Sequence, residues 1–283
     1  MLKKILSQPV LRIWFFIEIF GLILMVAAHL LGGRYLTLAA FIFMVAVHIL
    51  ILFLSKTRIY NFFEKTQIEG KDTWGLMLSA QKYAKLAGIP CPEVYLLDVS
   101  AALSFSFSNQ TQSSAIFLSE TLVEDLNARE LEALIAFETA RISLGQSFAA
   151  VIASSAGFVL NLLTGFIDRY VFMQFLFSEA KRKHIAEIFM TPFVTAFCWF
   201  LIRKEQTLRA DELAGQWMQN KKILAITLWK LESLVNTGPT KLRLCDSYLF
   251  TINPLTNRRW SRYLSLQASV RQRIRNLVGH YPI

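Results

Sequence analysis

Two long apolar runs near the start of the sequence limit what this chain can fold into. Residues 13–31 and residues 36–54 each comprise 19 residues, and Glu18 is the one acidic or basic side chain in either run apart from histidine. A helix rises 1.5 Å per residue, so each run is about 28 Å long, close to the thickness of a bilayer's hydrocarbon core. Because the link at residues 32–35 is short, we expect a transmembrane helical hairpin over residues 1–55.

The composition agrees with a membrane protein. Hydrophobic residues make up 54% of the chain and charged residues 18%, whereas about a quarter of the residues of a soluble globule are charged. The high apolar fraction excludes a disordered chain, and the low counts of 12 Gly and 7 Pro exclude a collagen-like one. The three cysteines are far apart and form no Cys-x-x-Cys pair, which predicts neither a disulfide framework nor a zinc ribbon and favours a reducing compartment.

The basic residues predict the orientation. Lys3, Lys4 and Arg12 precede the first run, two more basic residues follow the second, and Arg34 alone lies between them. The positive-inside rule therefore places both outer ends of the hairpin in the cytoplasm. Glu18, His29 and His48 lie within the runs, where ionisable groups are often functional. We favour the simpler interpretation that Glu18 reaches the interface and that the histidines are neutral and hydrogen-bonded.

Two weaker apolar segments follow, at residues 148–167 and 188–202, within a region of 148–202 that we expect to be transmembrane or membrane-embedded. The sequence does not decide whether both cross fully. From residue 203 onward there are 14 Lys and Arg against 5 Asp and Glu. This excess fits a cytoplasmic face beside anionic lipid. No nucleic-acid-binding motif accompanies it, so no nucleic acid is expected as a partner.

The remaining pattern predicts a mainly α protein with a small β-hairpin or sheet (α+β). A helix is expected over 74–86, stopped at Gly88, followed by a strand at 94–97. Residues 103–108 alternate Leu-Ser-Phe-Ser-Phe-Ser, which predicts a half-buried strand that pairs with 115–118. Asn127 and Glu130 form a capping box that opens a helix. Further helices are expected at 203–221, 223–235 and 264–277, and residues 253–260 look like an insertion.

Three parts of this pattern together resemble one family. They are AGIPCPEVY at residues 87–95, the hairpin that follows, and LEALIA at residues 131–136. Their order and spacing resemble those of the HtpX-type membrane zinc metallopeptidases, a gluzincin group. The resemblance implies a multi-pass protein of a bacterial-type inner (cytoplasmic) membrane. Residues 56–147 would form a cytoplasmic peptidase-like domain, which the helical residues 203–283 would complete.

The resemblance also implies a zinc site, and this chain departs from it. In the family, the two histidines of an H-E-x-x-H motif and a glutamate from a later helix bind the zinc ion. The glutamate inside the motif acts as the general base. The corresponding ligand positions hold Phe137, Arg141 and Thr207, whereas Glu138 keeps the base position and Asp211 keeps a supporting carboxylate. Phe offers no lone pair, Arg stays protonated and Thr is a poor zinc ligand. No cofactor is therefore expected here, although active relatives use zinc.

We hypothesise that Arg141 replaces the ion electrostatically. It lies three residues after Glu138, so the two side chains are neighbours on a helix. One guanidinium could bridge Glu138 and Asp211, while Phe137 fills space. The alternative is a solvated surface pair of Glu138 and Arg141 that contributes little to stability.

The favoured function is a membrane-embedded pseudopeptidase, predicted to be catalytically inactive, with a binding or regulatory role in membrane-protein quality control. Its partners would be membrane lipids and unfolded or membrane protein segments, or an active relative. Leu103, Phe105 and Phe107 would receive an extended peptide by strand addition, unless that edge is covered. Two alternatives remain: an active membrane metalloendopeptidase with ligands from elsewhere, and a structural, lipid-facing membrane protein.

Overall fold

The computed structural model describes residues 9–60, 64–68, 72–109, 113–170, 204–235, 246–254 and 267–281. The chain divides into two compact units. One unit contains Met1–Arg58 with Ile152–Leu201, and the other contains Ile59–Val151 with Ile202–Ile283. The predicted apolar segment at 188–202 lies outside the described residues, as does most of the expected insertion at 253–260.

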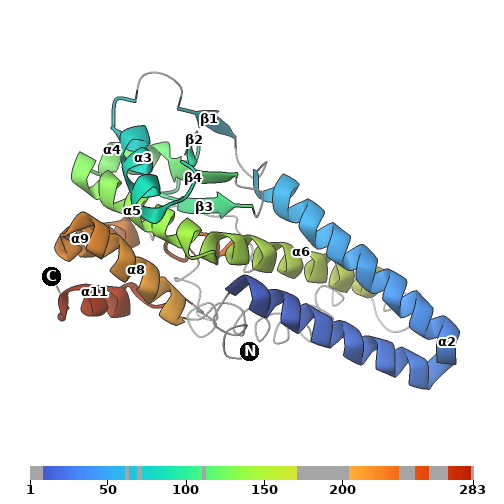
Figure 1. Cartoon of the computed structure of the whole chain (residues 1–283). Coiled ribbons are helices and arrows are strands. Elements are labelled where there is room, and N and C mark those ends of the chain that lie inside the picture. The colour runs from blue at the N-terminus through green and yellow to red at the C-terminus, as the bar shows by residue number, and fades with distance from the viewer. Residues whose placement is uncertain are drawn as a thin grey trace. The chain divides into compact units, whose positions relative to one another are not determined.

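The first unit contains the long helix α2 (Pro9–Tyr60), which is broken at Gly32 and Gly33. Gly33 has φ 60° and ψ −152°, a conformation that is essentially restricted to glycine. The two arms turn back on each other there (Figure 1). The Trp14 ring stacks on His48 of the opposite arm at 5.8 Å between centroids, and Glu18 Oε1 lies 3.5 Å from His48 Nε2. The predicted helical hairpin is therefore observed.

The hairpin is apolar on its outside as well as along its seam. Residues Trp14–Ser55 are long and apolar enough to cross a membrane. Many large apolar side chains on both arms are exposed, among them Leu30, Leu31 and Ile49. His29 Nδ1 lies 3.2 Å from Thr37 Oγ1 across the turn, in agreement with a hydrogen-bonded histidine. Passage through a membrane remains a prediction. The apolar segment predicted at 148–167 lies in one continuous helix, α6 (Gln146–Tyr170).

The second unit contains a four-stranded sheet in the order β1-β2-β4-β3. The strands are β1 (Lys65–Gln67), β2 (Glu93–Leu97), β3 (Ser104–Ser108) and β4 (Ser114–Ser119). The predicted hairpin of β3 and β4 is confirmed, with Phe105 opposite Phe117. Strand β2 pairs with β4 in parallel, and β1 adds to β2 in antiparallel fashion. The sequence did not predict β1, which has only three residues.

Local signals explain where the helices of this unit begin and end. Gly88, with φ 65°, closes the first of them as expected. The capping box of Asn127 and Glu130 opens α5. The last helix starts later than predicted, because Ser269 caps it in a second capping box with Gln272. The helices are α3 (Leu76–Ala87), α4 (Glu120–Asp125), α5 (Ala128–Ser143), α8 (Lys204–Met218), α9 (Lys221–Val235) and α11 (Val270–Val278).

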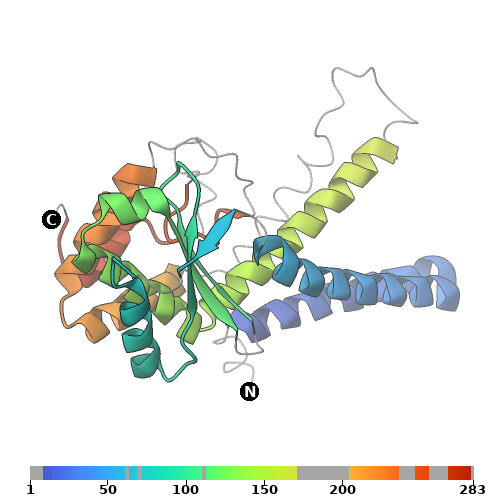
Figure 2. The ribbon, with the colours of Figure 1, turned by 90° about the horizontal axis from the view of Figure 1, so that it is seen from above.

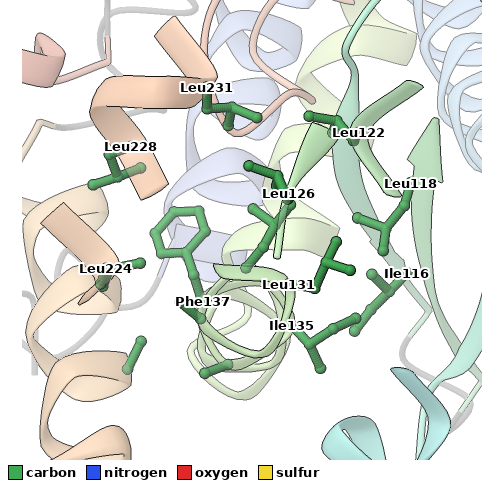
Figure 3. Packing of buried hydrophobic residues seen from close by; sticks show 14 of the residues in the cluster. Ile116, Leu118, Leu122, Leu126, Leu131, Ile135, Phe137, Leu224, Leu228 and Leu231 are labelled. Carbon is green, nitrogen blue, oxygen red and sulfur yellow. The ribbon is translucent and has the colours of Figure 1, made fainter. Parts of the chain in front are cut away.

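Helix α5 lies at the centre of the second unit. It packs against the sheet and contacts α3, α8 and α9, which lie on the same side of the sheet (Figure 2). Its side chains at Leu131 and Ile135 point toward Ile116 of β4, whereas Phe137 extends toward Leu228 of α9 (Figure 3). Every residue from Ala133 to Ile142 is buried. Polar side chains in this stretch must therefore find partners inside the protein.

Candidate functional site

Glu138 is the centre of a buried polar cluster. Its carboxylate is fully buried and accepts hydrogen bonds from four side chains. Ser104 donates to Oε1 at 2.9 Å and Ser106 donates to Oε2 at 2.6 Å. Thr251 also donates to Oε1, and Arg141 Nη1 donates to Oε2 at 3.1 Å. The carboxylate is thus satisfied entirely by the protein.

The serines of β3 correct the sequence-based interpretation of that strand. The alternation predicted a half-buried strand, but Ser104 and Ser106 are buried as well as Phe105 and Phe107. The serines share one face, because residues two apart on a strand point the same way. That face meets Glu138 on α5, and Ser106 also hydrogen-bonds Ser147 at 2.5 Å. The alternation therefore separates an apolar layer from a buried polar one, not a core from solvent.

Arg141 pairs with Glu138 inside the protein. The residue is 6% exposed, which contradicts the alternative of a solvated surface pair. Its Nη2 also donates to the Leu249 carbonyl at 3.0 Å, so the guanidinium joins α5 to the segment at 246–254. The hypothesis is correct to this extent: a cation accompanies the carboxylate at the centre of the site.

The hypothesis is wrong in assigning the same guanidinium to Asp211, which is bound by Arg273. Arg273 Nε donates to Oδ2 at 2.8 Å and Nη2 donates to Oδ1 at 2.7 Å. Burial raises the pKa of Asp211, while the positive charge of Arg273, and to a smaller extent that of Arg141, opposes the rise. Each buried carboxylate thus has a guanidinium of its own.

The Phe137 ring lies close to both cations. Its centroid is 4.5 Å from Arg273 Cζ and 5.9 Å from Arg141 Cζ, distances at which a ring face attracts a guanidinium. Phe137 therefore fills space, as predicted, and also contributes electrostatically.

The three positions that the family pattern assigns to ligands meet at one place. Phe137, Arg141 and Thr207 all line the same pocket, together with Gln146 and Gln206. The pocket is a small cavity of about 30 Å³, which has room for at least one water molecule. Glu205 is exposed on α8 and does not line it.

The side chains at these positions do not fit zinc. A phenyl ring has no lone pair to donate, and a guanidinium remains protonated. Within the described ranges, no group of three or more His, Cys, Asp or Glu side chains could hold a metal ion. His280, the one histidine of this unit in the described ranges, is exposed and does not line the pocket.

The predicted peptide-binding edge is covered near its middle. Strand β3 is the outer strand of the sheet, but Phe105 forms an antiparallel bridge with Phe250. The Thr251 amide also donates to the Ser104 carbonyl at 2.8 Å. Leu103, Phe105 and Phe107 are all buried. Strand addition at this edge would require the segment at 246–254 to move, so the structure favours the covered-edge alternative.

Several residues of the site were missed by sequence reasoning, and one left a readable signal. Val270, Ile274 and Leu277 form the buried face of α11, and Arg273 lies on that same face. A charged residue among the apolar positions of a helix indicates a buried partner. Thr251 and Leu249 gave no such signal, because they reach the site from the loop at 246–254 through long-range contacts.

The layout as a whole is that of a metallopeptidase domain, in which a buried helix carries the acidic residue between a β-hairpin and a later helix with a buried aspartate. Comparison with known proteins agrees. The model of "Peptidase family M48" matches residues 70–267. The chain belongs to this family, and the HtpX-type resemblance read from its sequence is confirmed.

Individual relatives extend the likeness over nearly the whole chain. A protease HtpX homologue from Pelotomaculum thermopropionicum is 22% identical over 273 residues, covering 94% of this chain and 97% of the relative. Another, from Acaryochloris marina, is 28% identical over 218 residues, covering 68% and 72%. The crystal structure of S. mikatae Ste24p has a similar fold, with a TM-score of 0.51 and 16% identity, over 95% of this chain and 64% of that chain.

Proposed function

We propose that this chain is a membrane-embedded pseudopeptidase, an M48 scaffold that binds without hydrolysing. In this proposal the zinc site is replaced by two carboxylate–guanidinium pairs. The observation that carries it is the convergence of Phe137, Arg141 and Thr207 on one pocket. These are the side chains that occupy the ligand positions, and a divalent ion beside Arg141 would be repelled.

The condition of Glu138 supports the same proposal. A general base must be within reach of the water or group whose proton it takes. Glu138 is fully buried, and its oxygens are occupied by donors from Ser104, Ser106, Thr251 and Arg141. The carboxylate is therefore held as part of the fold and is not offered to a substrate.

Metal content and cleavage of an unfolded protein such as casein test the proposal. We expect purified full-length protein to contain far less than one zinc per chain and to show no cleavage above buffer. Stoichiometric zinc that survives dialysis, or cleavage that a chelator stops, would support the atypical metalloendopeptidase instead.

A gain-of-ligand variant makes the test sharper. F137H/R141H/T207E restores the family's ligand types at the three converging positions, and we expect it to bind zinc and to melt at a higher temperature when zinc is added. F137A/R141A/T207A is the matched control, which changes the same positions without supplying ligands. Equal zinc binding by both variants would show that these positions are not the site.

We further propose that α2 crosses the membrane twice and that the peptidase-like unit lies in the cytoplasm of a bacterial-type cell. The exposed apolar side chains of the hairpin and the basic residues at its outer ends support this. Tyr35→Cys at the turn should react with an impermeant thiol reagent in intact cells. Leu78→Cys, on an exposed position of α3, should react only after the membrane is opened. A cysteine-free background serves both variants.

A further inference from the structure

The pocket lined by Phe137, Arg141 and Thr207 has side chains that suit the binding of an anion. Arg141 is the only charged residue among the described side chains that line it. Gln146, Gln206, Gln267 and Thr207 add neutral polar groups. Glu138, Asp211 and Arg273 are not among the residues that line the pocket. Of the four charged residues of the cluster, Arg141 alone lines it.

One buried side-chain donor beside this pocket has no partner among the described residues. Gln206 lines the pocket, and its Nε2 is buried without a hydrogen bond to any residue that the structure describes, although the backbone carbonyl of Gln206 accepts from Gln146 Nε2 at 2.7 Å. A buried donor without a partner needs an explanation. Arg141 adds a guanidinium with five N–H groups, of which Nη1 donates to Glu138 and Nη2 to the Leu249 carbonyl.

We infer that this pocket binds a carboxylate group. A carboxylate is planar, accepts several hydrogen bonds and pairs with a guanidinium more strongly than a neutral acceptor does. A carboxylate group is also small, which suits a cavity of about 30 Å³. The inference rests on the proposed function, since a peptidase scaffold presents peptide chains here. The carboxylate would come from a peptide C-terminus or from a free small acid.

Calorimetric titration of full-length, detergent-solubilised protein tests the inference, with its zinc content measured on the same sample. The probes are an acetylated tetrapeptide with a free C-terminus, the same peptide amidated, acetate and inorganic phosphate. We expect the free-acid peptide to bind at least about tenfold more tightly than its amide. Acetate that binds as well as the peptide would support the carboxylate site and identify a free acid as its source.

The variants separate the pocket from the rest of the surface. Gln206→Glu places a second carboxylate in the pocket and should weaken binding at least about tenfold. Gln216→Glu makes the same change on an exposed position of the same helix, and should leave binding unchanged. Arg141→Gln should also abolish binding, with folding checked by melting temperature.

The remaining outcomes would overturn the carboxylate site, the proposed function or both. Binding of phosphate without either carboxylate probe would overturn the inference, as would equal losses from Q206E and Q216E. A zinc-free protein that binds no probe would overturn the inference and leave the proposed function standing. A protein that carries zinc would overturn both.

Discussion

Arg273 of α11 donates two hydrogen bonds, of 2.7 and 2.8 Å, to the carboxylate of Asp211 on α8. Both residues are almost fully buried, with 1% and 0% of their surfaces exposed. The two residues are 62 positions apart in the sequence, and their pairing joins α8 to α11. Its geometry is the bidentate arrangement that favours arginine over lysine.

Loss of one member of this pair should be costly. Arg273→Met leaves Asp211 buried without its partner, and we expect a loss of stability of about 3–5 kcal/mol. The double variant R273M/D211L removes both charges and should recover most of it, because buried pairs can often be replaced by apolar groups. Chemical unfolding in detergent measures both. A double variant as unstable as R273M alone would contradict this account of the pair.

Glu138 should matter for stability and not for turnover. Glu138→Gln removes the charge that Arg141 faces and disturbs the four donors around it. We expect stability to fall by roughly 1–3 kcal/mol and casein cleavage to stay at the buffer level in both proteins. Melting temperature and a fluorescent cleavage assay provide the two readouts. Activity in the unmodified protein that disappears in E138Q would mean that this carboxylate is catalytic.

The surface pair of Lys82 and Glu132 should make stability depend on acidity. The hydrogen bond from Lys82, at 2.6 Å, lowers the pKa of Glu132 below its usual 4.5; burial opposes this, and a bond from Tyr83 adds to it. The folded protein therefore releases this proton more easily than the unfolded chain. Its contribution is present above about pH 4.5 and is lost as pH falls through the lower folded value.

Melting curves between pH 6 and pH 3 check this expectation. Glu132→Gln should be less stable than the unmodified protein above pH 5 and should approach it toward pH 3, so that its acid-side decline is flatter. Glu124→Gln, an exposed carboxylate on α4, is the matched control and should leave the decline as it is. Parallel curves for E132Q and the unmodified protein would remove Glu132 from the explanation.

Gly33 should be indispensable to the turn of the hairpin. Alanine there would have to adopt φ 60° and ψ −152°, at a cost of about 1–3 kcal/mol. Gly165→Ala is the control, since Gly165 lies exposed within α6 with open space around it and should be neutral or slightly stabilising. Thermal unfolding of the two variants in the same detergent compares them. A G33A protein as stable as G165A would mean that the turn relaxes freely.

Local features of the fold were predictable, and long-range ones were not. The capping box at Asn127, the stop at Gly88 and the β3–β4 hairpin each depend on neighbouring residues, and the structure contains all three. Strand β1 was not predicted, because three residues are too few to show the alternation of apolar and polar side chains that marks a strand. It is defined by its pairing with β2. The parallel pairing of β2 with β4 likewise follows from packing and not from any local signal.

In the candidate site, too, local contacts were predictable and long-range contacts were not. Glu138 and Arg141 lie one helical turn apart, so their pairing followed from spacing alone. The second guanidinium did not, because Arg273 reaches Asp211 across the fold. The serines of β3 were visible in the sequence, but alternation alone does not distinguish a solvent face from a buried polar one.

The ring of donors around Glu138 has a consequence for biosynthesis. Ser104 and Glu138 leave the ribosome well before Thr251 and Leu249, which satisfy the carboxylate and its guanidinium. Until residues 246–254 have been synthesised, Glu138 therefore lacks its Thr251 donor and Arg141 lacks the Leu249 carbonyl. A chain truncated before residue 246 would keep only the contacts that Ser104 and Ser106 make with this carboxylate, together with Arg141.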